Sequence, residues 1–98
     1  MATVYYLRGA LGDLDRLTAF LLESDPAAAR RTAALIRAAV NALEGSPLIG
    51  RPTATGLREL VISRGKTGYV ALYRFDPEED RVLVAAIRHQ REAGFEDG

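Results

Sequence analysis

The stretch over residues 68–75 reads Gly-Tyr-Val-Ala-Leu-Tyr-Arg-Phe, and its aromatic and β-branched residues are typical of a strand. Side chains alternate between the two faces of a strand. One face takes the odd-numbered positions, which are Tyr69, Ala71, Tyr73 and Phe75. Val70 and Leu72 lie on the other face, so both faces are largely apolar. This pattern predicts a central strand that is covered on both sides.

Two further extended runs flank this strand in the sequence, over residues 57–62 and 81–88. Residues 63–67 and 76–80 separate the runs, and they contain the Gly, Pro, Ser and Asp that are typical of turns. Connections this short join antiparallel neighbours. We therefore expect a three-stranded antiparallel meander in the second half of the chain.

The first part of the chain predicts a short strand and an amphipathic helix. Residues 3–7 read Thr-Val-Tyr-Tyr-Leu, which favours a strand. From about residue 10 leucines recur at helical spacing, which predicts a helix over residues 10–23. The opposite side of this helix carries its charged residues, which are Asp13, Asp15, Arg16 and Glu23.

A second helix is predicted over residues 26–44. Asp25 supplies a capping carboxylate, and Pro26 stands in the first turn, where its missing N–H removes no hydrogen bond. The element order is strand, helix, helix, strand, strand, strand. We expect an α+β fold in which both helices pack on one face of the sheet. At 98 residues the chain is short enough for one domain over residues 1–98.

Charge and cysteine content exclude several function classes. The chain has 13 Lys or Arg and 13 Asp or Glu, and it has no Cys. A net charge of zero lacks the cationic field that drives non-specific nucleic-acid binding. The lack of Cys excludes a disulfide framework, a thiolate nucleophile and Cys-ligated zinc. No apolar run approaches the ~20 residues of a membrane span, so we expect no membrane association and a cytoplasmic location.

Three further features do not indicate a ligand site. Gly65-Lys66-Thr67 lacks the glycine that a phosphate loop needs five positions before Gly65, where Leu60 stands. The acidic residues 78–80 lack the spacing of a calcium loop. His89 is the only histidine, which excludes a histidine-cluster metal site. We expect neither a metal nor a cofactor.

The end of the last strand carries the most informative polar residues, Ile87-Arg88-His89-Gln90-Arg91. Two guanidinium groups near an imidazole suit a phosphate or an acidic peptide, but they are also common at a solvated strand end. Further cations lie on the preceding strands and their turn, at Arg58, Arg64, Lys66 and Arg74. The register of the sheet decides whether these cations share a face.

Phe20 lies about a third of a turn away from the centre of the leucine stripe. Aromatic residues outside the core face often anchor interfaces, although single exposed aromatics are also common. The spacing predicts a side chain that is exposed in the isolated chain and buried against a partner.

The ordered motifs resemble the RelE/ParE superfamily of bacterial toxins from type II toxin–antitoxin pairs, over about Thr3 to Phe95. The motifs are Asp25-Pro26-Ala27-Ala28-Ala29, Pro47-Leu48-Ile49-Gly50-Arg51-Pro52, Leu57-Arg58-Glu59-Leu60-Val61-Ile62, Gly68-Tyr69 with Leu72-Tyr73-Arg74, and the strand end at Ile87 to Arg91. The resemblance implies a toxin held in a tight hetero-oligomer by a ParD-like or similar antitoxin. We expect antitoxin contacts at Phe20, Arg58 and Arg74, and no sequence-specific DNA binding by this chain alone.

The superfamily contains two activities, and the departures from its patterns favour the ParE-like one. RelE-like members cut mRNA on the ribosome and usually carry Arg after the tyrosine of the middle strand, where this chain has Val70. They also tend to carry a tyrosine near the C-terminus, where this chain has only Phe95. ParE-like members poison DNA gyrase without cutting RNA, so no catalytic residue is expected. The expected target contacts are Arg64, Lys66, Arg88, His89 and Arg91.

Two alternatives stay open. In a ribosome-dependent endoribonuclease, His89 would act as base or acid, and Tyr73 would be a second proton carrier. Arg91, with Arg58 or Lys66, would then surround the phosphate. In a degenerate pair member, the chain would bind its antitoxin and arrest nothing.

Overall fold

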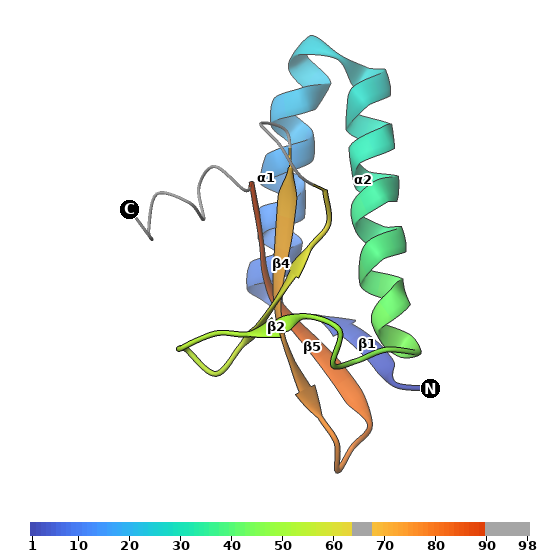
Figure 1. Ribbon diagram of the computed structural model, residues 1–98. Coiled ribbons are helices and arrows are strands. Elements are labelled where there is room, and N and C mark those ends of the chain that lie inside the picture. Colours follow the sequence, from blue (N-terminus) through green and yellow to red (C-terminus); the bar gives the residue numbers. More distant parts are fainter. Residues whose placement is uncertain (64–67, 90–98) are drawn as a thin grey trace.

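A computed structural model of the chain describes residues 1–63 and 68–89 (Figure 1). Over these residues a helical hairpin packs on one face of a sheet. The strands are β1 (Thr3–Tyr6), β2 (Arg51–Pro52), β3 (Arg58–Val61), β4 (Tyr69–Asp76) and β5 (Arg81–His89), and the helices are α1 (Arg8–Ser24) and α2 (Pro26–Asn41), with a 3-10 turn at Ala42–Glu44. Neither described helix is long and apolar enough to cross a membrane.

The sheet in this part of the chain has five strands in the order β1-β5-β4-β3-β2. The expected α+β class and the meander of β3, β4 and β5 are confirmed, but β1 pairs with β5 in parallel, so the sheet is mixed. The helical hairpin returns the chain to the start of β1, where the Ala2 amide donates a 2.9 Å hydrogen bond to the Glu44 carbonyl. β3 therefore begins at the same end as β1, and two reversals give β5 the direction of β1.

β2 was not expected from the sequence. It has two residues, Arg51 and Pro52, which are too few to show an alternating pattern. Proline lacks the N–H of a ladder hydrogen bond and is tolerated at a sheet edge, which is where β2 lies.

The helix boundaries follow their capping residues. The Oδ1 atom of Asp25 accepts a 3.1 Å hydrogen bond from the Ala28 amide, and Pro26 opens α2 as expected. The α-helical part of α2 ends at Asn41, and the remaining turn to Glu44 is a 3-10 helix. α1 begins at Arg8, two residues before the predicted start.

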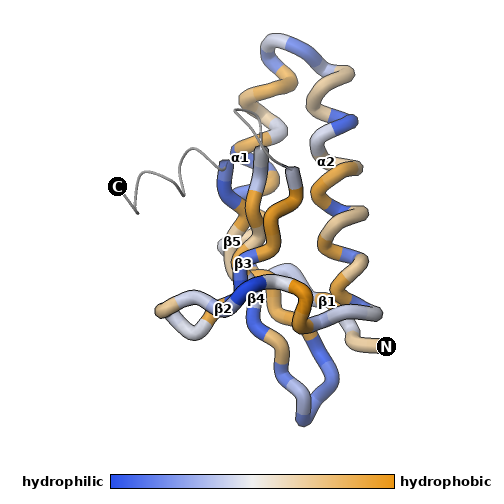
Figure 2. Tube along the Cα trace, in the orientation of Figure 1, coloured by the Kyte–Doolittle hydropathy of each residue, from blue (hydrophilic) through white to orange (hydrophobic). Residues whose placement is uncertain are grey.

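The core lies between the hairpin and the sheet. Figure 2 shows apolar segments along both helices and along the strands, whereas the turn between the helices and the turn after β4 are hydrophilic. The largest fully buried side chains are Ile36, Val40, Leu43, Tyr73, Val82, Val84 and Ile87. Burial of each large apolar side chain contributes about 1.5–3 kcal/mol. β4 lies in the centre of the sheet, as its apolar faces predicted.

Only part of the leucine stripe of α1 is buried in this core. Leu17 is buried, but the side chains of Leu11 and Leu22 are 51% and 52% exposed. The sequence pattern therefore marks a broader apolar surface on α1 than the sheet covers.

Candidate functional site

The strand end that carries Arg88 and His89 divides these two side chains between opposite faces of the sheet. His89 pairs with Tyr69, and Arg88 pairs with Val70. The rings of Tyr69 and His89 meet edge to face, with centroids 5.3 Å apart and planes at 80°. Tyr69 belongs to the core under the helices, so His89 lies on the helix side and Arg88 lies on the other face. We call this face the open side because neither helix packs on it, although Val70 on this face is buried.

Neighbouring residues of a strand always point to opposite faces, and an irregularity in β5 decides which face each of these two takes. Leu72 pairs with Ala86 and Tyr73 pairs with Val84, which leaves Ala85 without a partner on β4. A bulge of one residue exchanges the two faces of the strand beyond it. Val84 and Ile87 are consequently both buried in the core, although they lie three positions apart.

Asp13 of α1 contacts the strand just beyond this bulge. Its Oδ2 atom accepts a 2.9 Å hydrogen bond from the Ile87 amide, and its Oδ1 atom lies 3.7 Å from the Arg16 guanidinium. Along this edge of β5, the described pairing with β1 ends at Tyr6 opposite Val84. The sequence pattern placed Asp13 on the outer side of the helix, and the structure places its carboxylate against the sheet instead.

Tyr73 and Arg58 both hold the segment that follows the 3-10 turn. The Tyr73 hydroxyl donates to the Pro47 carbonyl and accepts from the Gly50 amide, each at 2.8 Å. The Arg58 Nη1 atom donates to the carbonyls of Gly50 at 2.7 Å and Leu48 at 3.3 Å. The Tyr73 side chain is fully buried. The hydroxyl that was expected to carry a second proton in an endoribonuclease therefore makes two hydrogen bonds within the chain and anchors this segment.

Gly50 permits this arrangement because it lies against the Tyr73 ring. A Cβ at Gly50 would lie 2.7 Å from Cε1 of Tyr73 and 3.0 Å from the Glu59 carbonyl oxygen. Real Cβ contacts are not this short, so only glycine fits. The anchored segment exposes Leu48 and Ile49, which the sequence predicted as part of a family motif but not as site residues.

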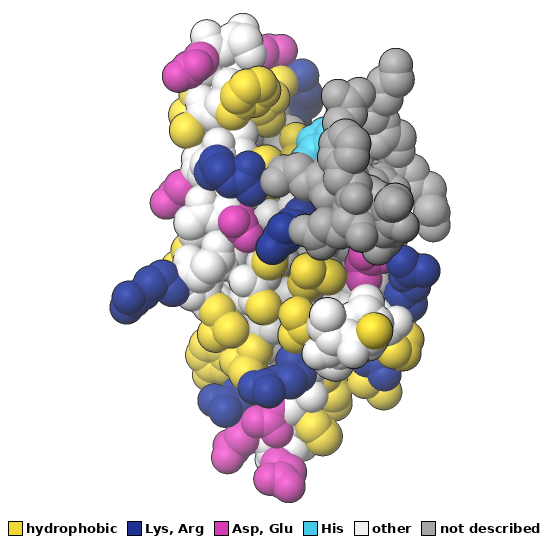
Figure 3. All heavy atoms as spheres, turned by 90° about the vertical axis from the view of Figure 1, so that its left-hand side faces the viewer, with side chains coloured by type: hydrophobic (Ala, Val, Ile, Leu, Met, Phe, Trp, Pro, Cys, Tyr) yellow, Lys and Arg dark blue, Asp and Glu magenta, His cyan; other side chains and the backbone are white. Residues whose placement is uncertain are grey.

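The cations that were candidates for one surface do not share a face. Arg58 pairs with Tyr73 and lies on the helix side of β3, whereas Arg74 and Arg88 lie on the open side. Arg74 is exposed, and it pairs with Leu83, which in turn pairs with Tyr5. Figure 3 shows basic side chains spread among hydrophobic and acidic ones on one side of the molecule. Arg64, Lys66, Arg91 and Phe95 lie outside the described residues.

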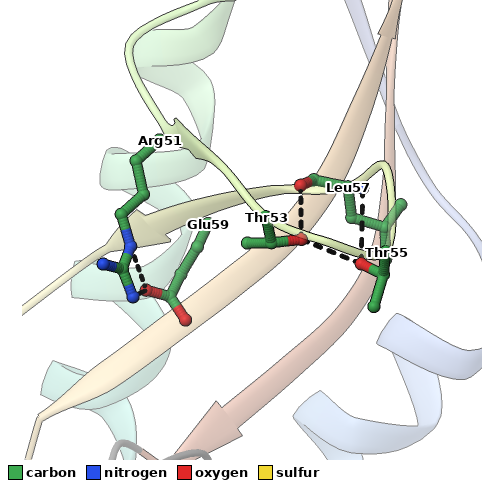
Figure 4. Close-up of polar contacts among 5 residues, drawn as sticks. All are labelled: Arg51, Thr53, Thr55, Leu57 and Glu59. Atoms are coloured by element: carbon green, nitrogen blue, oxygen red, sulfur yellow. Dashed lines mark hydrogen bonds and ion pairs between the residues drawn. The ribbon is translucent and has the colours of Figure 1, made fainter.

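The other basic side chains near this surface form ion pairs. Arg51 reaches Glu59, with an N–O distance of 2.9 Å, across the β2–β3 pair (Figure 4). Arg81 lies 3.3 Å from Asp76 across the β4–β5 pair. In the turn between β2 and β3, Thr53 Oγ1 donates to the Leu57 carbonyl at 2.8 Å (Figure 4). These contacts stabilise the lower end of the sheet rather than a ligand site.

A groove lies between the helical hairpin and the end of the sheet that carries Tyr69. Its volume is about 420 Å³. Its lining is Leu21, Ala28, Arg31, Thr32, Leu35, Ser63 and Tyr69. Phe20, the neighbour of Leu21 in the chain, is 74% exposed, as its spacing predicted. The groove lining by residues 1–63 and 68–89 is mainly apolar, with one cation and no acidic residue.

The family model described as "ParE toxin of type II toxin-antitoxin system, parDE" matches residues 4–94. The chain belongs to this toxin family. It is 40% identical over 80 residues to Toxin RelE3 of Caulobacter vibrioides, covering 82% of this chain and 85% of that protein. It is also 40% identical over 62 residues to Toxin RelE1 of the same organism, covering 63% of this chain and 67% of that protein.

Two solved structures share the fold of this toxin. One is the chromosomal ParDE toxin–antitoxin system from P. aeruginosa, with a TM-score of 0.77 and 22% identity over 91% of this chain and 96% of that chain. The other is the toxin–antitoxin complex RelBE2 from Mycobacterium tuberculosis, with a TM-score of 0.65 and 26% identity over 90% of this chain and 96% of that chain. The expected RelE/ParE superfamily is confirmed.

The toxin shows few groups suited to metal binding or proton transfer around its strand end. No group of His, Cys, Asp and Glu in the described ranges is arranged to hold a metal ion. The row across the sheet at Arg88 consists of Val61, Val70 and Arg88, which places a cation at the end of an apolar pair. This row can bind an anionic or polar partner, but it contains no acid or base.

Proposed function

We propose that this toxin acts by binding its target, and that the target is DNA gyrase, as in the ParE-like branch. The observation that carries the proposal is the match of the ParE toxin family model to residues 4–94. RNA cleavage by a 2′-hydroxyl requires a base and an acid near the phosphate. His89 lies against Tyr69 on the face opposite to Arg88. The Tyr73 hydroxyl is engaged in two hydrogen bonds within the chain.

The proposed target surface is the open side of the sheet end. Arg88 supplies a forked donor there, which suits a carboxylate or phosphate of a macromolecular partner. Val61 in the same row is partly exposed and adds an apolar contact, whereas Val70 between them is buried. Arg64, Lys66 and Arg91 remain proposed contacts of the same target, and His89 is a proposed contact from the other face of the same strand end.

The toxin is proposed to be neutralised by an antitoxin that occupies the groove beside Tyr69. Both solved structures that share the fold are of toxin–antitoxin systems. Phe20 exposes a large aromatic side chain next to Leu21 of the groove, and Arg31 places a cation in the lining. An antitoxin segment with an apolar face and an acidic residue fits this combination. Arg74 is a proposed contact on the sheet, whereas Nη1 of Arg58 is already used within the chain.

A ribosome-dependent endoribonuclease is the second candidate. It is favoured by the names of the two Caulobacter vibrioides relatives, Toxin RelE3 and Toxin RelE1. In this candidate His89 is the first residue to serve as base or acid, with Arg91 near the phosphate. Replacement of a positioned proton-transfer group lowers a rate by about 10²–10⁴.

Two parallel assays with the toxin freed from its antitoxin separate the candidates. The first measures supercoiling and trapped double-strand breaks with purified gyrase, and the second measures mRNA cleavage on ribosomes. We expect inhibition and breaks with gyrase, lost in Arg88→Ala and retained in Arg81→Ala. Arg81 is the matched control, because it lies on the same strand at the other end. Ribosome-dependent cleavage that fails in His89→Ala, with no effect on gyrase, would overturn the proposal.

A further inference from the structure

The bulge in β5 decides which polar side chain the proposed target meets. In a regular strand, residues 82, 84, 86 and 88 would share the helix side. Arg88 would then face the core, and Ile87 and His89 would face the open side. The observed strand avoids this because Ala85 is extra, so that Ile87 is fully buried and Arg88 pairs with Val70 on the open side.

The first turns of α1 meet the bulge at two points. Gly9 lies so close that a Cβ there would be 3.2 Å from the Ala85 carbonyl oxygen. Asp13 accepts the hydrogen bond from the Ile87 amide. Residues four positions apart lie on the same face of a helix. One face of α1 therefore contacts β5 at the extra residue, Ala85, and again two residues beyond it, at Ile87.

The Asp13 carboxylate supplies an acceptor that the sheet does not. The pairing of β1 with β5 ends at Val84, so no described strand runs beside Ile87 on that edge. A partly buried amide left without an acceptor is unfavourable, and a hydrogen bond to an ionised carboxylate is stronger than one between neutral groups. The regular register would remove the bulge but would bury Arg88 and expose Ile87.

We infer that Asp13 is a positioning residue, which holds the bulge of β5 and thereby keeps Arg88 on the open face and His89 against Tyr69. The functional part of this inference rests on the proposed function, in which Arg88 contacts the target. The structural part does not, because it concerns the geometry of residues 85–89 alone. Asp13 itself contacts no target; its effect passes through the backbone of Ile87.

The experiment compares the full toxin chain, freed from antitoxin, with four variants. Asp13→Ala removes the acceptor, Asp13→Asn keeps an acceptor oxygen without the charge, and Asp13→Glu displaces the acceptor by one methylene. Asp15→Ala is the matched control, because Asp15 is an exposed acid on the same helix. NMR measures amide exchange at Ile87 and the contact between the rings of His89 and Tyr69, and growth arrest is scored separately.

The inference predicts that amide exchange at Ile87 is about tenfold or more faster in Asp13→Ala, the effect of losing one hydrogen bond. The ring contact weakens in the same variant, and growth arrest is reduced. Asp15→Ala resembles the wild type in all three readouts, and Asp13→Asn falls between the wild type and Asp13→Ala, because its amide oxygen accepts a weaker hydrogen bond than the carboxylate. A general loss of stability would not be rescued selectively by asparagine.

Unchanged exchange at Ile87 and an unchanged ring contact in Asp13→Ala would overturn the inference. If Asp13→Ala does not fold, the inference is tested by comparing amide exchange at Ile87 between the other two Asp13 variants. Asp13→Asn should protect Ile87 better than Asp13→Glu, and the reverse order would contradict the positioning role. The Arg88→Ala variant tests the proposed function. Full growth arrest in Arg88→Ala would reject the target contact. If amide exchange at Ile87 is still faster in Asp13→Ala, the positioning role of Asp13 is supported independently of the target.

Discussion

The backbone amide of Gly50 donates a 2.8 Å hydrogen bond to the hydroxyl of Tyr73, 23 residues further along the chain. The same hydroxyl donates to the Pro47 carbonyl, so one side chain from the central strand fixes both ends of the segment over residues 47–50. Arg58 adds two hydrogen bonds to this segment. The connection between the helical half and the sheet is therefore held by side chains of β3 and β4.

Tyr73→Phe should lower the free energy of unfolding by about 1–3 kcal/mol, because it leaves the buried Gly50 amide without an acceptor. Chemical denaturation measures the loss. Tyr5→Phe is the control, since Tyr5 is half exposed and its replacement should change stability by less than about 0.5 kcal/mol. Equal stability of the Tyr73→Phe variant and the wild type would contradict the anchoring role.

Gly50→Ala should destabilise the toxin by about 1–3 kcal/mol, because the new Cβ overlaps the Tyr73 ring. Gly45→Ala offers a comparison, because Gly45 has open space around its Cα and φ of −97°. That variant should be neutral or slightly more stable than the wild type. Thermal unfolding of both variants is the measurement, and similar melting temperatures would count against a close contact at Gly50.

Phe20→Ala should weaken antitoxin binding by about tenfold or more, as expected of an exposed aromatic that becomes buried at an interface. Its stability as an isolated chain should hardly change. Leu11→Ala is the control, because Leu11 is also exposed on α1 but lies more than about 13 Å along the helix from Phe20 and from the groove residue Leu21. Calorimetric titration with the antitoxin gives both affinities, and equal affinity of Phe20→Ala and wild type would remove Phe20 from the interface.

The hydroxyl of Tyr6 is buried without a hydrogen-bond partner among the described residues. Burial raises the pKa of Tyr6 above 10.0, and the nearby Arg37 partly opposes this rise. Because the unfolded chain ionises first, stability should fall as the pH rises from about 10 towards the higher folded pKa. Tyr6→Phe should be at least as stable as the wild type at pH 7 and should lose less stability above pH 10. Parallel alkaline losses in the two proteins would contradict this assignment.

Much of the architecture could be predicted from local patterns. The alternation over residues 68–75 identified the central strand, and Asp25 with Pro26 marked the start of α2. These signals arise from neighbours in the sequence, which is why they are visible without a structure. The parallel pairing of β1 depends on the path of the whole hairpin, and no local pattern encodes it.

The candidate site was less accessible to sequence analysis, because it depends on a single extra residue. The pair Ala85-Ala86 offers no obvious signal for a bulge, yet it decides which faces Arg88 and His89 occupy. Asp13 and Ile87 are 74 residues apart, so their hydrogen bond has no local signature. Arg58 looked like a surface cation, but the register of β3 turns it towards the segment over residues 47–50.

The decisive measurement is a plasmid supercoiling assay with purified DNA gyrase and the toxin freed from its antitoxin. Wild-type toxin and Arg81→Ala should inhibit supercoiling and leave trapped double-strand breaks, whereas Arg88→Ala should leave gyrase active. Full gyrase activity in the presence of folded, growth-arresting toxin would contradict the proposed target.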